Sequence, residues 1–231
     1  MFFTFRSLLL AALLGTASVT TVAAQEQQPT ESKEAAYTRT ITERAAKIVA
    51  TLGLPDEAKA TKVRDVIAGQ YRALNDVHEA RKAQLAALKA QPKDDHTEAA
   101  TKKVETQAAT ALDKLHSKYL KQLGRYLTPP QVDQVKDGMT YRVLPITMTA
   151  YEDMLPTLTA EQKTQMLAWL TEAREHAMDA STSQDKHAWF GKYKGRINNY
   201  LSAAGIDMNQ AGKDWQARIA ARKAAQAPAA Q

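Results

Sequence analysis

Apolar side chains recur at intervals of three and four residues along most of this chain, and this spacing is the feature that most restricts its fold. An early example is the set Ile41, Ala45, Ile48, Val49 and Leu52. A period near 3.6 residues places such side chains on one face of an α-helix. The spacing therefore predicts an all-α protein.

Breaks in this pattern divide the chain into about six to seven helices, which we expect to form a helical bundle. The second and third helices are long and separated by a short turn at Pro92, so they should form an antiparallel hairpin. The expected ranges are 38–52, 56–88, 97–122, a helix opening at 128, 159–180, 183–204 and 209–223.

Two of the expected helices open with the pattern Leu-Thr-x-x-Gln. Thr128 is expected to cap its helix, Pro129 to take the first helical position, and Gln131 to bond back to the cap. The same device recurs at Thr159 and Gln162. These starts resemble the repeated motif of small periplasmic stress chaperones of the LTxxQ class, which implies a chaperone as an alternative function.

Between these two caps, residues 136–156 contain Gly138, Pro145 and Pro156, which interrupt a helix. We therefore expect a short helical turn and an ordered loop between the fourth and fifth helices. Tyr141 and Tyr151 lie in this loop. They either contact a ligand or fill the gap that the broken helices leave.

The termini and the composition favour export. Residues 1–24 read as a signal peptide, with a basic start, a short apolar core and small residues before an expected cleavage after Ala24. We expect a flexible leader over 25–37, a single all-helical domain over 38–224 and a disordered tail over 225–231. The 231 residues carry a net charge of +6 and no cysteine, which excludes disulfides and a lipid-modified cysteine anchor.

The stretch 179–201 has the most distinctive chemistry of the chain. As a helix it places on one stripe Trp189, Tyr193, Ile197 and either Tyr200 or Leu201. This stripe is expected to be core, with Gly191 and Gly195 allowing a neighbouring helix to approach. The other stripes carry basic and amide side chains. Aromatic faces beside such donors are typical of carbohydrate sites, where cationic groups also bind a uronate carboxylate.

We therefore predict a ligand-binding face formed by this helix and the preceding tyrosine-containing loop. Its candidate residues are Tyr141, Tyr151, His187, Trp189, Lys192, Lys194, Arg196, Asn198 and Asn199.

Other chemistries find less support. Glu172, Glu175, His176 and Asp179 could share one ion on a helix face, but nearby basic residues would pair with them equally well. Two carboxylates could act as an acid and base in a hydrolase, yet no nucleophile, phosphate or dinucleotide motif is present. We predict no metal, no cofactor and no nucleic-acid partner, and leave catalysis open.

Four motifs are specific enough to indicate a family: VKDGMTY, YxxMLPxLTxEQK, EARExAMDA and KHAWFGKYKGRINNYL. They resemble an uncharacterised family of secreted Bacteroidota proteins for which sugar binding has been suggested. The resemblance implies export, an all-helical domain and a role in polysaccharide use. Our interpretation is a periplasmic or secreted protein, without a stable membrane anchor, that binds acidic, pectin-like oligosaccharides. An LTxxQ-like chaperone and a glycan-active enzyme are the alternatives.

Overall fold

A computed structural model describes residues 31–226, and every regular element in this range is an α-helix. The expected all-α class is therefore confirmed. The described chain has eight helices, one more than the upper end of the expected range. They are α1 (Lys33–Ala50), α2 (Glu57–Lys89), α3 (Asp95–Leu123), α4 (Pro129–Met139), α5 (Val143–Met154), α6 (Ala160–Met178), α7 (Ser183–Ala203) and α8 (Met208–Gln226).

The expected signal peptide and the first part of the leader lie outside the described residues, as does most of the tail. Helix α1 begins at Lys33, five residues before the expected start, because Ser32 caps it by accepting a hydrogen bond from the Ala35 amide. Helix α8 continues to Gln226. No helix in residues 31–226 combines the length and the apolar character needed to span a bilayer.

The expected ordered loop between the fourth and fifth helices is wrong, because α5 occupies most of it. Pro145 lies in the first turn of α5, where a backbone N–H has no partner within the helix, so the proline does not break it. Gly138 likewise lies inside the last turn of α4. Only a tight turn at residues 140–142 separates α4 from α5.

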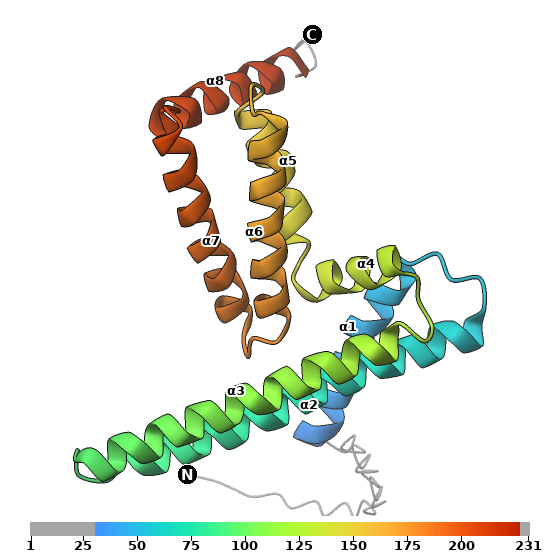
Figure 1. Cartoon of the computed structure of the whole chain (residues 1–231). Helices are drawn as coiled ribbons and strands as arrows, with labels where there is room; N and C mark the ends of the chain where they lie inside the picture. The colour runs from blue at the N-terminus through green and yellow to red at the C-terminus, as the bar shows by residue number, and fades with distance from the viewer. Residues whose placement is uncertain (1–30, 227–231) are drawn as a thin grey trace, which may run out of the picture.

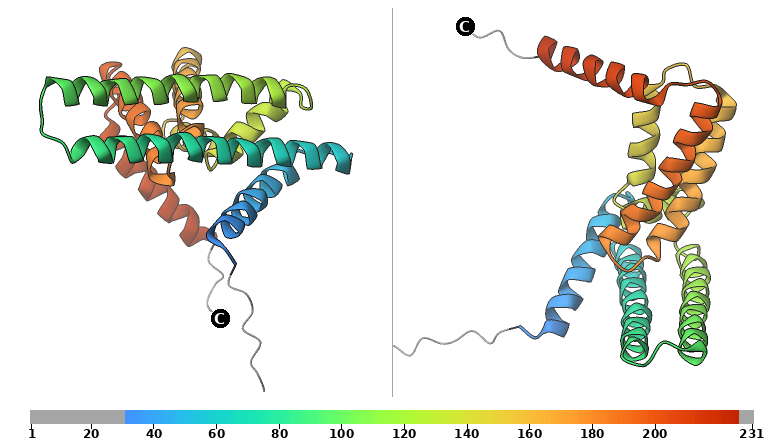
Figure 2. Two further views of the ribbon diagram at one scale, coloured as in Figure 1. Left: turned by 90° about the horizontal axis from the view of Figure 1, so that it is seen from below. Right: turned by 90° about the vertical axis from the view of Figure 1, so that its left-hand side faces the viewer.

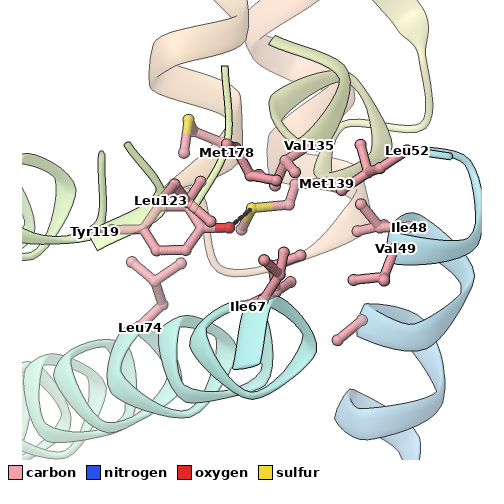
Figure 3. Close-up of a cluster of buried hydrophobic side chains, with 13 residues drawn as sticks. Ile48, Val49, Leu52, Ile67, Leu74, Tyr119, Leu123, Val135, Met139 and Met178 are labelled. Atoms are coloured by element: carbon pink, nitrogen blue, oxygen red, sulfur yellow. Dashed lines mark hydrogen bonds between the residues drawn. The ribbon is translucent and has the colours of Figure 1, made fainter. Parts of the chain in front are cut away.

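Helix α1, the long α2–α3 hairpin and α4 share one hydrophobic core (Figure 1). Figure 2 shows α2 and α3 side by side along most of their length. Near the centre of this core the Tyr119 hydroxyl donates to the Met139 sulfur over 3.2 Å (Figure 3). Met178, at the end of α6, is the one buried member of this core that comes from beyond α4.

Helices α5, α6 and α7 form a second core, on which the start of α8 packs. Phe190, Tyr193, Ile197 and Leu201 are its buried residues from α7. The expected core stripe of α7 is thus correct at Tyr193, Ile197 and, of the two alternatives for its last member, Leu201. Trp189 and Tyr200 are only partly buried at the edge of this core.

The turn between α6 and α7 points toward the middle of the α2–α3 hairpin (Figure 1). The contact is direct, since Nε2 of His78 in α2 lies 2.8 Å from the carbonyl oxygen of Asp179. We call the region where the α6–α7 turn meets α2 the junction.

Candidate functional site

A network of charged side chains joins the two cores. Arg174 of α6 has only 7% of its side chain exposed and donates to Asp133 at 2.6 Å and to Asp137 at 2.9 Å, both on α4. A buried guanidinium is tolerated only when carboxylates surround it in this way. The ion pairs therefore fix α6 on α4.

The neighbouring Glu175 and Asp179 extend this network to α3. Lys136 donates to both oxygens of Glu175, and His116 lies 2.6 Å from Asp179 and 3.4 Å from Glu175. Hydrogen bonds to Asp179 and Glu175 raise the pKa of His116 to about 9, against the effect of burial. Burial opposes the ionisation of Glu175, but its bonds to His116 and Lys136 outweigh burial and lower its pKa to about 2.

Lys186 enters the junction from the first turn of α7. Its Nζ donates to the carbonyl oxygens of Ala177 and Met178 at 3.0 Å each, so it caps the end of α6. Burial lowers the pKa of Lys186 to about 8, and the nearby positive charge of Arg44 acts in the same direction. An anion beside Lys186 would offset both effects.

One side of the junction contains a pocket of about 730 Å³, which we call the Tyr141 pocket. Helices α1, α2, α4 and α7 and the turn before α5 all contribute to its wall. The lining residues are Arg44, Lys47, Ile48, Thr51, Tyr71, Gln134, Asp137, Gly138, Met139, Tyr141, Arg142, Pro145 and Lys186.

The turn that carries Tyr141 and Arg142 has an unusual backbone. Both residues adopt the left-handed conformation, with φ of 58° and 57°. Each such non-glycine residue costs roughly 1–2 kcal/mol, and strained residues of this kind gather at functional sites. The conformation places Tyr141 at the pocket with 47% of its surface exposed.

The pocket is strongly cationic. Arg44, Lys47 and Arg142 are exposed and have no ion-pair partner within residues 31–226, and Lys186 adds a fourth basic group. Asp137 is the one acidic residue of the lining, and its carboxylate already accepts from Arg174. The arrangement can therefore bind an anion without first breaking an internal ion pair.

A second hollow, of about 720 Å³, lies on the other side of α7; we call it the Trp189 groove. His176 stacks on the Trp189 ring with centroids 4.4 Å apart, and the Lys192 ammonium lies 5.2 Å from the ring centroid. The lining residues are His78, Arg81, Ala109, Leu112, Asp113, His176, Asp179, Ala180, Ser181, Asp185, Ala188, Trp189 and Lys192.

The predicted site residues divide among these places. Tyr141 lines the first pocket, and His187 lies beside it with ring centroids 5.4 Å apart. Trp189 and Lys192 line the Trp189 groove instead. His176 and His187, which the sequence suggested as a converging pair, contact different aromatic residues on the two sides of α7.

The remaining predicted residues are Tyr151 on α5 and four residues farther along α7. Tyr151 is buried in the second core, where its hydroxyl donates to Asn198 at 2.6 Å and lies 3.4 Å from the Lys194 carbonyl oxygen. Arg196 covers the Trp169 ring at 4.5 Å, and the Asn199 side chain is exposed. None of these residues lines either hollow.

The four residues considered for a metal site do not converge on one point. Glu175 and Asp179 are held by cations of α3 and α4, whereas His176 stacks on Trp189. Glu172 lies 4.0 Å from Arg196. No group of three or more metal-ligating side chains occurs in the part of the chain that the structure describes.

Sequence reasoning missed most of the residues that line the Tyr141 pocket, among them Arg44, Lys47, Tyr71, Arg142 and Lys186. Arg44 and Lys47 look like ordinary solvated residues on the outer face of an amphipathic helix. The one local signal was the pair Tyr141-Arg142 directly after a helix end, in a segment rich in aromatic and sulfur-containing side chains.

In a comparison with protein families, residues 38–221 match a family described as "Protein of unknown function (DUF3826)". Because the match spans most of the chain, the protein belongs to this family. No curated protein matches the chain.

Proposed function

We propose that this member of the DUF3826 family is a secreted or periplasmic protein that binds an acidic oligosaccharide in the Tyr141 pocket. The observation that carries the proposal is the convergence of Arg44, Lys47 and Arg142, all without an ion-pair partner in the described chain, on a pocket that also exposes Tyr141. Guanidinium groups bind carboxylates through two parallel hydrogen bonds, and a tyrosine ring offers an apolar face to a sugar.

The geometry favours an extended acidic sugar over a small inorganic anion. Inorganic phosphate would use only the cations, whereas the hollow of about 730 Å³ is within the size range of small-molecule sites. Tyr71 and the exposed Tyr141 also place two phenol groups in the lining. A uronate chain would use the charges and the aromatic faces together.

The test is titration calorimetry of the protein with an acidic tetrasaccharide, such as a galacturonate oligomer, and with neutral tetrasaccharides. We expect the acidic ligand alone to bind in this pocket. Arg142→Gln and Tyr141→Ala should each weaken the affinity for this ligand about tenfold. Lys47→Gln should weaken binding, while Lys118→Gln, an exposed lysine outside both hollows, serves as the matched control.

Three outcomes would count against the proposal. These are the absence of binding to any acidic sugar, equal binding by the pocket variants and the Lys118 variant, and displacement of the sugar by equimolar inorganic phosphate. Product release during the titration would favour a glycan-active enzyme. Suppression of client aggregation without sugar affinity would favour a chaperone.

A further inference from the structure

An exposed isoleucine lies beside the Tyr141 pocket and has no part in the acidic-sugar proposal. Three large hydrophobic side chains are strongly exposed within residues 31–226, and two of them lie at the start of α5. These are Tyr141, which is 47% exposed, and Ile146, which is 61% exposed. We propose that this face docks reversibly on an anionic lipid bilayer, with Ile146 entering the edge of the acyl region and the basic side chains of the pocket meeting the headgroups.

The backbone places Ile146 next to the pocket and outside it. Its N–H donates to the carbonyl oxygen of Arg142 at 3.2 Å, so the two residues are about one helical turn apart. Arg142 and Pro145 both line the pocket, whereas Ile146 does not. Ile146 can therefore contact a surface that covers the mouth of the pocket.

The same face carries positive charge that no acidic neighbour neutralises. Arg44, Lys47 and Arg142 are exposed and have no ion-pair partner in the part of the chain that the structure describes. Glu43, which precedes Arg44 in the sequence, is already paired with Arg39 at 3.4 Å. Basic side chains close to an anionic bilayer each strengthen binding to it, so the charges and the exposed apolar side chains favour the same partner.

A bilayer suits this composition better than a protein or a nucleic acid. A stable protein interface buries roughly 800 Å² on each partner, whereas only two large hydrophobic side chains are strongly exposed here. A nucleic acid would use the cations and leave Ile146 without a role. At a bilayer surface, a tyrosine ring lies at the level of the headgroups, an isoleucine enters the acyl boundary and basic side chains meet the phosphates.

The test is cosedimentation of the protein with vesicles of phosphatidylcholine alone and with vesicles that also contain phosphatidylglycerol. We expect binding to the mixed vesicles alone, and we expect added salt to weaken it. Ile146→Asn should lower the partition coefficient at least about fivefold, because it removes the apolar anchor, whereas Ile146→Leu should bind as the parent does. Leu167→Asn is the matched control, since Leu167 of α6 is 46% exposed and lies outside the pocket lining. Thermal unfolding curves confirm that the variants are folded.

Charge variants and the sugar titration complete the experiment. Lys47→Gln should lower the partition coefficient about fivefold, whereas Lys118→Gln should leave it unchanged. Ile146→Asn should retain the affinity of the parent for the acidic tetrasaccharide, because Ile146 lies outside the pocket lining.

Three results would overturn the proposal. These are the absence of binding to anionic vesicles, equal binding to vesicles of phosphatidylcholine alone, and equal partition coefficients for Ile146→Asn and Leu167→Asn. The last result is what a purely electrostatic contact with any polyanion would give. Because vesicle binding and sugar binding are measured separately, either proposal can fail without the other.

Discussion

His116 gives the most direct test of the network that joins the two cores. Its pKa rises from an ordinary value of 6.5 to about 9 in the folded protein, chiefly through hydrogen bonds with Asp179 and Glu175. At about 1.4 kcal/mol per pKa unit, the difference of about 2.5 corresponds to roughly 3 kcal/mol of stability. The His116 side chain is 22% exposed, so solvent screens this contribution only in part.

The direction of the pH dependence follows from the raised pKa. Below pH 6.5 both the folded and the unfolded states hold the proton, and the contribution of His116 is complete. Between 6.5 and about 9 only the folded state holds it, so the free energy of unfolding falls as the pH rises. Lys186 acts in the opposite direction, since its pKa is lowered to about 8 and the folded state gains stability between 8 and 10.5.

The assay is urea unfolding of the parent protein and of His116→Asn at intervals from pH 6 to 9.5. Because Lys186 contributes equally to both proteins, the difference between their curves isolates His116. At pH 6 we expect the free energy of unfolding of His116→Asn to be lower than that of the parent by about 3 kcal/mol, or its Tm to be lower by about 6–12 °C. This difference should shrink to near zero by pH 9.5. His96→Asn, at an exposed histidine near the start of α3, is the control and should follow the parent. Parallel curves for the parent and His116→Asn would refute the reasoning.

Other substitutions test packing and charge elsewhere in the molecule. Gly138→Ala would place a Cβ 2.8 Å from Ile48 Cγ1 and should destabilise the protein by about 1–3 kcal/mol in urea unfolding. Gly191→Ala, which has open space around it, should instead stabilise the protein by up to about 1 kcal/mol. Equal effects of the two substitutions would contradict the close approach of α1 to α4 at Gly138. Arg174→Leu leaves the α4 carboxylates without their cation and should lower the free energy of unfolding by about 3–5 kcal/mol. An unchanged free energy of unfolding would mean that the network is dispensable. Asp153→Ala removes the carboxylate that accepts hydrogen bonds from Trp215 and Arg222 of α8, so backbone hydrogen exchange should accelerate in α8 alone. Acceleration throughout the protein would argue against this local role.

The expected and observed structures agree best where the determining contacts are local. The caps at Thr128 and Thr159 were correct because a capping box involves only residues three apart. The Gln162 backbone N–H donates to the Thr159 hydroxyl at 3.2 Å, and the Thr159 backbone N–H donates to the Gln162 side-chain oxygen at 2.9 Å. The helix expected over 183–204 also begins with a capping box, in which Thr182 is the cap and Asp185 lies at N3. Periodicity likewise found Tyr193 and Ile197 in the core.

Interpretations of glycine and proline were weaker, because the same residue has different effects in different surroundings. Gly191 and Gly195 were expected to allow a close helix approach, yet nothing lies within 4 Å of a Cβ built at either position. Gly138, which was expected to interrupt a helix, is the glycine at which α1 approaches α4. Pro145 was expected to break a helix that in fact begins two residues before it.

The sequence by itself determined the helical class, most helix boundaries, the capping devices and much of the core stripe of α7. These features depend on side chains within about one helical turn of each other, so they can be read along the chain. Only the tertiary structure decided which residues of α7 line each of the two hollows and which line neither. His78 and Asp179 are 101 residues apart and meet because the α6–α7 turn packs against α2. Arg44 and Arg142, unremarkable in sequence, become parts of one cationic pocket for the same reason: separate helices converge there, and no local pattern encodes that convergence.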